Sequence, residues 1–433
     1  MISYTVKFFT SGVDKWNHSD DDYHYEPGAI PQDVHPSQLD TCAVNDSSQS
    51  LHTRNLDNFM NTLQTIIPPS AQFMKEYQNP CWYMTLSLTR KIKKMFMHKG
   101  GSLTDTEAAY IMSEKFYPDR GMVTKSLVCI PKVFFIGFPR SGSTQLYQML
   151  TRHPQLIGGA NKEPHWWTRF PFTAKFPHNI LAIIRYLIHY QEASEYVAEH
   201  PDSLLIDGSQ STIWDTRNTN NLCILPSLIS RVVPSAKYIV LMRNPVSRLY
   251  SDFTYLCTSY LKAHRMETSP EYVMQSPDTF HIGAEIEVRE FQKCLESLPL
   301  DVCTHYVLDS KLNVSAAQPG CGRVRLGIIL YYAHIAKWLR TIPKEKFLFL
   351  RTDDLTKDPY AILSRIWKFL ELPLQPPAEL QDILYSHTHS NLLSQTRMKP
   401  QTQQMLQKFF ETYNKKLAEL LQDDRFLWQD TSN

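Results

Sequence analysis

The sequence has few glycines and no cysteine pattern that would bind a metal. Glycine accounts for 14 of the 433 residues, about half of the usual share of roughly 7%, so glycines that lie close together are expected to have a backbone role. The eight cysteines form no Cys-x-x-Cys pair, which argues against a zinc ribbon and a thioredoxin-type dithiol. We predict instead that some of the cysteines form disulfides.

The sequence also lacks an excess of one charge and a long apolar run. Lys and Arg total 45 against 43 Asp and Glu, a balance that excludes nucleic-acid binding through bulk charge. No stretch reaches the roughly 18 uncharged apolar residues of a membrane helix, and the first residues do not read as a signal peptide. An anionic partner must therefore be bound by local clusters of Arg and Lys.

The chain is predicted to divide near residue 130. Residues 1–130 form an N-terminal extension, polar at first and helical over 82–97. From 131 to 433 short apolar runs alternate with amphipathic segments, which predicts a catalytic domain of α/β class, a P-loop-type parallel sheet flanked by helices. Strands are expected at 133–136, 203–206, 237–241 and 347–350, and helices at 144–152, 180–199, 245–261, 326–341, 358–371 and 403–422.

A glycine-bounded loop, Gly137-Phe138-Pro139-Arg140-Ser141-Gly142-Ser143-Thr144, follows the first strand of the predicted sheet. A strand, a loop and a helix in this order let backbone N–H groups and the helix N-terminus converge on an anion. The glycine spacing matches a nucleotide P-loop, but Ser143 stands where that loop has its lysine, which disfavours a triphosphate substrate. The structural alternative is a turn that caps the helix through Ser143 or Thr144.

Two segments resemble the sulfotransferases that use 3′-phosphoadenosine 5′-phosphosulfate (PAPS). The loop is similar to their 5′-phosphosulfate loop, with Arg140 where many members carry lysine. Residues 238–251 resemble their 3′-phosphate motif, in which an arginine at a strand end and a serine eight residues later bind that phosphate. The alternative is an ion pair at a helix start for Arg243 and an ordinary buried serine for Ser251. The PAPS-binding residues that the resemblance implies are Pro139, Arg140, Ser141, Gly142, Ser143, Thr144, Arg243 and Ser251, with no metal.

The catalytic residues are predicted in the segment Asn161-Lys162-Glu163-Pro164-His165-Trp166-Trp167. It resembles glycosaminoglycan sulfotransferases, in which the glutamate is the proposed base. A sugar hydroxyl is a weak nucleophile, and a carboxylate within hydrogen-bond reach can take its proton. Glu163 is therefore favoured as the base, and His165 competes because cytosolic family members use a histidine. Arg140 and Lys162 would stabilise the charge on the leaving nucleotide.

Further candidates flank this segment and the last predicted helix. Trp166 and Trp167 would either stack on a sugar or pack in the core. Asp207 and Ser209 loosely occupy the place of the family's Glu-Lys-Ser/Thr segment beside the active site. Arg397 or Lys399 would bind the nucleotide, since related enzymes place a basic loop there; the alternative for each is a solvated surface charge.

The motif wording is closest to the branch of the family that acts on chondroitin sulfate at the 6-hydroxyl of N-acetylgalactosamine 4-sulfate. This implies a glycosaminoglycan acceptor and a location in the Golgi lumen, with the membrane anchor absent from this sequence, or secretion. Three Asn-x-Ser triplets, at Asn17, Asn45 and Asn313, are compatible with that route. The cations predicted to contact the acceptor are Lys175, Arg185, Lys262, Arg265, Arg323 and Arg325.

Three alternatives stay open at this point. A heparan-type or other carbohydrate sulfotransferase differs only in its acceptor. A P-loop kinase with an unusual loop would bind ATP in place of PAPS. A non-catalytic glycan-binding protein would retain the nucleotide fold without its chemistry, and an intact Glu163 with both phosphate motifs argues against it.

Overall fold

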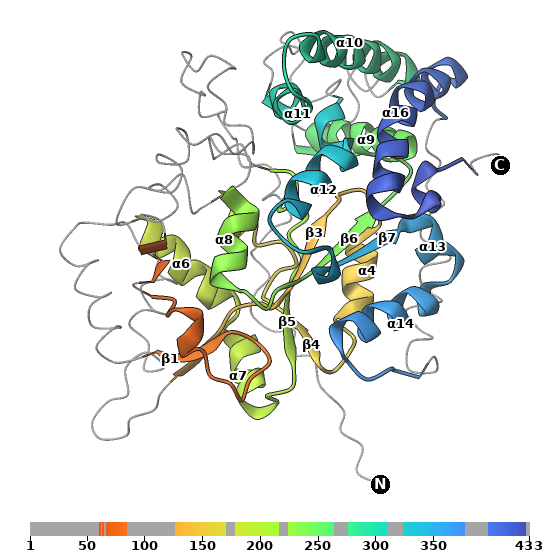
Figure 1. Ribbon diagram of the computed structural model, residues 1–433. Coiled ribbons are helices and arrows are strands. Elements are labelled where there is room, and N and C mark those ends of the chain that lie inside the picture. Colours follow the sequence, from red (N-terminus) through yellow and green to blue (C-terminus); the bar gives the residue numbers. More distant parts are fainter. Residues whose placement is uncertain are drawn as a thin grey trace, which may run out of the picture.

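The central feature of the computed structural model is a five-stranded parallel sheet with helices on both faces (Figure 1). The strands lie in the order β4-β5-β3-β6-β7, and each neighbouring pair is parallel. The predicted α/β class with a flanked parallel sheet is thereby confirmed. The structure describes residues 60–61, 63–64, 66–84, 126–169, 178–215, 224–263, 276–309, 324–376 and 397–429.

Four of the five strands lie where the sequence predicts them. They are β3 (Val133–Gly137), β5 (Leu204–Asp207), β6 (Lys237–Met242) and β7 (Phe347–Arg351). All residues of β3 and β5 are buried, which explains why their sequences show no polar alternation. The fifth strand, β4 (Leu156–Gly158), has only three residues and was not predicted.

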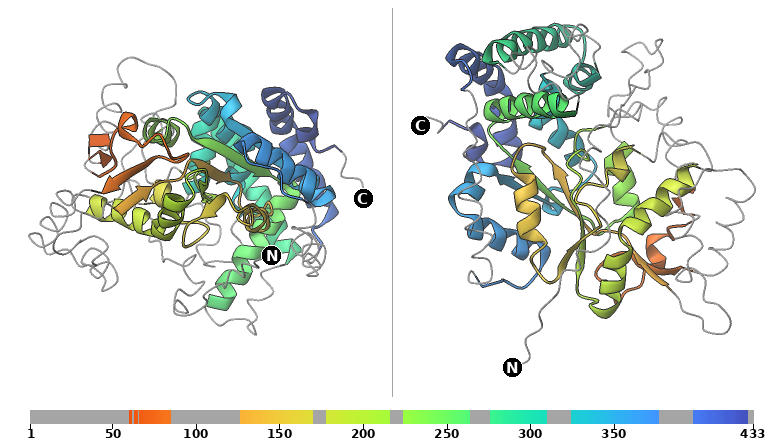
Figure 2. Two further views of the ribbon diagram at one scale, coloured as in Figure 1. Left: turned by 90° about the horizontal axis from the view of Figure 1, so that it is seen from below. Right: turned by 180° about the vertical axis from the view of Figure 1, so that it is seen from behind.

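The two faces of the sheet pack against different sets of helices (Figure 2). Val133 and Phe135 of β3 face a core shared with α4 (Ser143–Leu150), α13 (Thr352–Lys357) and α14 (Pro359–Leu370). Phe134 and Ile136 point to the other face. That face packs with α6 (His178–His189), α7 (Gln191–Glu199), α8 (Ile224–Val232), α9 (Pro245–Ala263) and α12 (Tyr331–Leu339).

The helices predicted between residues 144 and 422 are confirmed with two corrections. The segment 180–199 is not one helix, because the chain breaks at the buried Tyr190 between α6 and α7. The segment 326–341 begins as a 3-10 turn, η5 (Leu326–Ile329), before α12. Two unpredicted helices, α10 (Pro277–Leu295) and α11 (Leu300–Asp309), lie with α9 and α16 (Pro400–Leu421) above the sheet in the view of Figure 1. Short 3-10 turns are η3 (Ser70–Gln72), η6 (Lys344–Lys346) and η8 (Asp424–Leu427).

A small hairpin corrects the prediction of a helix over 82–97. Residues 82–84 belong to the strand β1 (Cys81–Met84), which pairs antiparallel with β2 (Ser126–Cys129); residues 85–97 lie outside the described part. Cys81 lies opposite Cys129 in this pairing, and the two form a disulfide. The partner strand lies more than forty positions away, so the local pattern could not show it.

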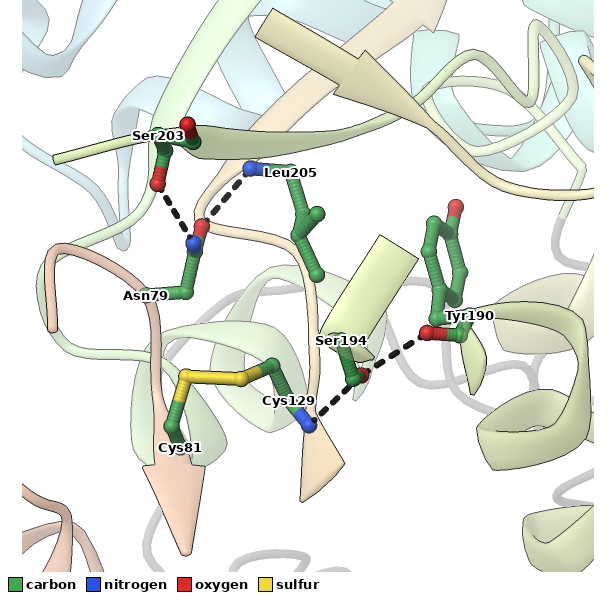
Figure 3. Close-up of a disulfide and its surroundings, with 7 residues drawn as sticks. All are labelled: Asn79, Cys81, Cys129, Tyr190, Ser194, Ser203 and Leu205. Atoms are coloured by element: carbon green, nitrogen blue, oxygen red, sulfur yellow. Dashed lines mark hydrogen bonds between the residues drawn. A yellow bond between two sulfur atoms is a disulfide. The ribbon is translucent and has the colours of Figure 1, made fainter. Parts of the chain in front are cut away.

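Hydrogen bonds join this hairpin region to the main sheet (Figure 3). The side-chain amide of Asn79 donates to the Ser203 carbonyl at 2.8 Å and accepts from the Leu205 N–H at 2.7 Å. The Ser194 hydroxyl of α7 accepts from the Cys129 N–H at 3.0 Å. The described part of residues 1–130 thus contacts the sheet closely, while the division into extension and catalytic domain stays a prediction.

The prediction of disulfides is confirmed. A second bridge, Cys294–Cys303, joins α10 to α11, and Cys257 is also disulfide-bonded. The three Asn-x-Ser triplets lie outside the described residues. Among the described helices, none combines the length and apolar character needed to span a bilayer.

Candidate active site

The glycine-bounded loop lies between β3 and the start of α4, as the sequence predicts. Gly142 takes a left-handed conformation with φ of 85°, and α4 begins at the next residue, a geometry that favours glycine because it has no Cβ. The Thr352 hydroxyl at the start of α13 donates to the Ser141 carbonyl at 2.7 Å. The loop backbone is therefore fixed from outside, and the N-terminus of α4 is available for an anion.

Arg140 extends from this loop toward α9. Its Nη2 lies 3.5 Å from the Ser251 Oγ, and its Cζ lies 4.2 Å from the centre of the Tyr255 ring. Burial lowers the pKa of Arg140, and its Nε is buried without a hydrogen-bond partner. A donor in this state suits an anionic ligand that would supply the missing acceptor.

The second predicted phosphate-binding pair lies at the end of β6 and in α9. Arg243 directly follows β6, and burial lowers the pKa of its guanidinium. None of the described residues makes a side-chain hydrogen bond or ion pair with that guanidinium. Ser251 is buried in α9 and faces Arg140. The two phosphate motifs thus meet at one place, although the sequence separates them by about a hundred residues.

Two buried residues of α9, which the sequence analysis missed, organise the charges of this region. The Arg248 Nε donates to the Pro139 carbonyl at 2.9 Å, and its Nη2 lies 3.4 Å from Asp252 Oδ1. The Arg325 Nε donates to Asp252 Oδ2 at 2.8 Å. Burial alone would raise the pKa of Asp252, but Arg248 and Arg325 hold it below its ordinary value. The i,i+4 spacing of Arg248 and Asp252 was the sequence signal for this pair.

Lys162 and Glu163 lie at the N-terminus of α4. The Lys162 ammonium lies 3.3 Å from the Ser143 Oγ and 3.4 Å from the Thr144 Oγ1, and it forms an ion pair with Glu163. The Glu163 side chain is 28% exposed and that of Lys162 16%, so both remain accessible to a ligand. The predicted cation and the predicted base are thus in contact beside the loop.

His165, the competing base candidate, lies next to Glu163. Its Nε2 is 3.4 Å from Glu163 Oε2, and its Nδ1 is 2.7 Å from the Ser211 Oγ. The backbone of His165 is left-handed, with φ of 51°, a conformation that costs about 1–3 kcal/mol for a residue other than glycine and persists only where neighbours hold it. Both base candidates are therefore close enough to act on one substrate hydroxyl.

The two tryptophans after His165 belong to the core. Trp166 and Trp167 in α5 (Trp166–Arg169) are 2% and 1% exposed and pack against Tyr186. The packing interpretation of these residues is therefore confirmed, and the sugar-stacking interpretation is wrong. Asp207 and Ser209 are also buried, directly behind the segment 162–165.

Arg397 and Lys399, the two nucleotide-binding candidates before the last helix, form no hydrogen bond or ion pair with the loop 138–142 in the described part of the chain. Lys399 forms an ion pair with Asp278 at the start of α10, and Arg397 is exposed. Their proposed contact with the nucleotide stays a prediction.

The predicted acceptor cations are only partly placed. Arg325 contacts Asp252 beside the loop, and Arg185 is exposed on α6. Lys175, Arg265 and Arg323 lie outside the described residues, as does the side chain of Lys262. The described residues contain no group of three or more His, Cys, Asp or Glu that could hold a metal ion.

Comparison with known proteins agrees with this geometry. The model of the sulfotransferase domain family matches residues 130–419. Carbohydrate sulfotransferase 15 of Mus musculus is 28% identical over 419 residues, which cover 85% of this chain and 67% of the relative. Heparan sulfate glucosamine 3-O-sulfotransferase 5 of the same species is 20% identical, with 67% and 72% covered.

Among solved structures, a sulfotransferase from Alicyclobacillus acidocaldarius matches 69% of this chain and 98% of its own, with a TM-score of 0.41 and 15% identity. Because the family model covers well over half of the sequence, the chain belongs to the sulfotransferase domain family. The predicted sulfotransferase enzyme is thereby confirmed.

Proposed function

We propose that the protein transfers the sulfuryl group of PAPS to a sugar hydroxyl of a glycosaminoglycan. The observation that carries the proposal is the contact of Lys162 with Glu163 and with both hydroxyls at the N-terminus of α4. This arrangement sets a carboxylate, a cation and a helix N-terminus around one point. In-line transfer to an alcohol needs these three elements, a base for the hydroxyl and positive groups for the leaving nucleotide.

The residues around the loop fit the two anionic groups of PAPS. The loop amides and Arg140 would hold the 5′-phosphosulfate, and Arg243 with Ser251 would hold the 3′-phosphate. Two observations support this assignment: the buried Nε of Arg140 has no hydrogen-bond partner among the described residues, and the Arg243 guanidinium makes no hydrogen bond to a described residue. Each donor would gain a charge-assisted hydrogen bond when the nucleotide binds.

The local charge balance also suits an anionic substrate. Arg140, Arg248 and Arg325 lie around one buried carboxylate, Asp252, and Arg243 lies near Arg140. A site with such a surplus of positive charge attracts anions and makes their binding dependent on salt. Arg325, fixed by Asp252, is the placed cation that could also meet a sulfate on the acceptor.

Glu163 is proposed as the base, with His165 as its competitor. Glu163→Gln retains the shape of the side chain but cannot take the proton, so kcat should fall by about 10² or more. The affinity for 3′-phosphoadenosine 5′-phosphate (PAP), measured by isothermal titration, should stay near that of the unaltered protein. Loss of activity in His165→Ala together with normal activity in Glu163→Gln would reverse the assignment.

The proposed acceptor is the 6-hydroxyl of N-acetylgalactosamine 4-sulfate in chondroitin sulfate. The names of the carbohydrate sulfotransferase relatives support a carbohydrate acceptor. The two described disulfides support work in an oxidising compartment, and we propose the Golgi lumen or the cell exterior.

Transfer of labelled sulfate to a panel of chains tests the acceptor. Chondroitin 4-sulfate should accept better than unsulfated chondroitin or heparan precursors, and added salt should raise its KM more than that of PAPS. Equal rates on sulfated and unsulfated chondroitin, or a preference for a heparan-type chain, would overturn this acceptor. Titration with PAP against ATP separates the proposal from a P-loop kinase.

A further inference from the structure

The buried carboxylate of Asp207 lies behind the proposed catalytic segment, where it cannot reach a substrate. Asp207 is the last residue of β5 and is 1% exposed. Its Oδ2 accepts a hydrogen bond from the Tyr186 hydroxyl at 2.8 Å, and its Oδ1 accepts one from the Ser209 N–H at 2.9 Å. Since the side chain is buried and each of its oxygens already accepts a hydrogen bond from the protein, Asp207 is not placed to act as a base for the acceptor hydroxyl.

The loop that Asp207 holds contacts the catalytic segment repeatedly. The Ser209 hydroxyl accepts from the His165 N–H at 2.9 Å, and the Ser211 hydroxyl lies 2.7 Å from the His165 Nδ1. The Gln210 N–H donates to Glu163 Oε2 at 3.4 Å. Both base candidates are therefore held by the same short loop, residues 208–211.

Close packing fixes the distance between the loop 208–211 and the segment 162–165. The Gly208 N–H donates to the Lys162 carbonyl at 3.1 Å. A Cβ at position 208 would lie 2.9 Å from that carbonyl oxygen and 2.8 Å from the Tyr147 ring, so only glycine allows this approach. The Gln210 side chain adds a bond to the Phe135 carbonyl of β3 at 2.9 Å.

A second anchor reaches Asp207 from the helix behind it. The Tyr186 hydroxyl donates to Asp207 and accepts from the Trp167 Nε1 at 3.0 Å. Trp167 lies two residues after His165 in the chain. The chain Trp167–Tyr186–Asp207–Ser209 therefore closes a ring that starts and ends at the backbone around His165.

We propose that Asp207 and Tyr186 are positioning residues that set the orientation of Glu163 and His165 through the loop 208–211. The inference rests on the proposed function of these two residues as base candidates. The left-handed backbone of His165 is held by the hydrogen bond that its N–H donates to the Ser209 hydroxyl, and its ring is held by the contact of Nδ1 with the Ser211 hydroxyl. A buried ring of this kind keeps the base near its productive position without taking part in the proton transfer.

Tyr186→Phe tests the inference, because it deletes only the hydroxyl between Trp167 and Asp207. We expect kcat to fall at least about tenfold, with the PAP dissociation constant unchanged within about twofold. The control is Tyr360→Phe in α14. The half-buried Tyr360 hydroxyl also donates to a backbone carbonyl, that of Gln375 at 3.1 Å, and no described hydrogen bond joins it to Tyr186 or Asp207. That variant should keep its kcat.

A double-substitution cycle separates positioning from general loosening. If Tyr186 acts through the base, adding Tyr186→Phe to Glu163→Gln should lower kcat much less than it does alone. Equal losses in both backgrounds, equal kcat losses in the Tyr186 and Tyr360 variants, or an unchanged kcat in Tyr186→Phe would overturn the inference.

A readout that does not need activity keeps this test distinct from that of the proposed function. The imidazole signals of His165 in a proton–carbon NMR spectrum, assigned through a His165→Gln variant, should move in Tyr186→Phe and remain in place in Tyr360→Phe. Unmoved signals in both variants overturn the positioning of His165. An unaltered protein that binds PAP but transfers no sulfate to any chain refutes the proposed function, and the spectrum still decides the positioning.

Discussion

The region around the loop 138–142 and the region around the strands β1 and β2 differ in how their polar groups are paired. Around the loop 138–142, arginines outnumber the one buried carboxylate, and donors of Arg140 and Arg248 are left without partners. Around the hairpin β1/β2, the hydrogen bonds of Asn79 to the start of β5 and of Cys129 to α7 join neutral groups, and a disulfide closes the pairing. Unsatisfied charge costs stability but creates affinity for an anion, whereas satisfied neutral contacts only stabilise the fold. Function and stability should therefore be separable by substitution.

The largest expected effect is on the stability of the hairpin region. Replacing Cys81 and Cys129 by Ala opens a bridge that spans 48 positions, and the loss of unfolding free energy should be about 4 kcal/mol. PAP affinity at low temperature should stay unchanged. Urea unfolding and titration measure the two quantities.

The bridge Cys294–Cys303 is the matched control for this effect. It spans 9 positions, so its removal should cost only roughly 2.5 kcal/mol. Equal losses for the two bridges would contradict the loop-length argument. A fall in PAP affinity in a folded Cys81→Ala/Cys129→Ala variant would break the separation of the two regions.

Arg243→Ala in the loop region should lower the affinity for PAP and leave the stability of the fold unchanged. Loss of its charge-assisted contact should weaken PAP binding by at least about 2 kcal/mol, roughly 30-fold. The melting temperature should hardly change, because no described residue depends on that guanidinium for a hydrogen bond. Arg152→Ala, at an exposed position, is the control for a general charge effect. Unchanged affinity would remove Arg243 from the proposed site.

The third effect is confined to acid pH. His334 of α12 is buried under the loop, where its ring lies 6.0 Å from that of Phe138 and its Nε2 donates to the Gly327 carbonyl at 2.8 Å. Burial lowers the pKa of His334 to about 3. A depressed pKa means that the stability is complete above the unfolded value near 6.5 and is lost as the pH falls below it.

His334→Gln keeps a donor for the carbonyl and removes this titration. Between pH 7 and pH 5 the free energy of unfolding of the variant should therefore fall by roughly 2 kcal/mol less than that of the unaltered protein. Urea unfolding at pH 7 and pH 5 measures the difference, with the exposed His200→Gln as the control. Parallel loss in the variant and the unaltered protein between these pH values would refute the prediction.

The sequence predicted the parts of the fold that depend on local patterns. Runs such as Phe134 to Ile136 and Tyr238 to Leu241 are uniformly apolar because both faces of their strands are covered. The strand at Trp82 was misread as helix, because its pairing with residues 126–129 is determined over a long distance. The two phosphate motifs were readable because each is a contiguous segment at a strand end.

The contacts that join these segments were not readable. Ser209 and Gln210 contact the segment 162–165, which lies more than forty positions earlier in the sequence. This contact depends on the tertiary structure, so no local pattern shows it. Asp252 was missed because its role arises from Arg325, which lies 73 positions away. Nor could composition decide that Trp166 and Trp167 face the core, since a tryptophan suits both a sugar and a hydrophobic cluster.

The bridge between Cys81 and Cys129 also determines how the chain behaves when it is cut. The two cysteines enclose residues 82–128 within one covalent ring, so a single backbone cleavage anywhere inside that ring releases no fragment. Electrophoresis without reductant would still show one band at full mass, and reductant would resolve it into two. An N-terminal piece cut off in this way would stay tethered to β2, and with it to the sheet that carries the active site, until a thiol reached the bridge.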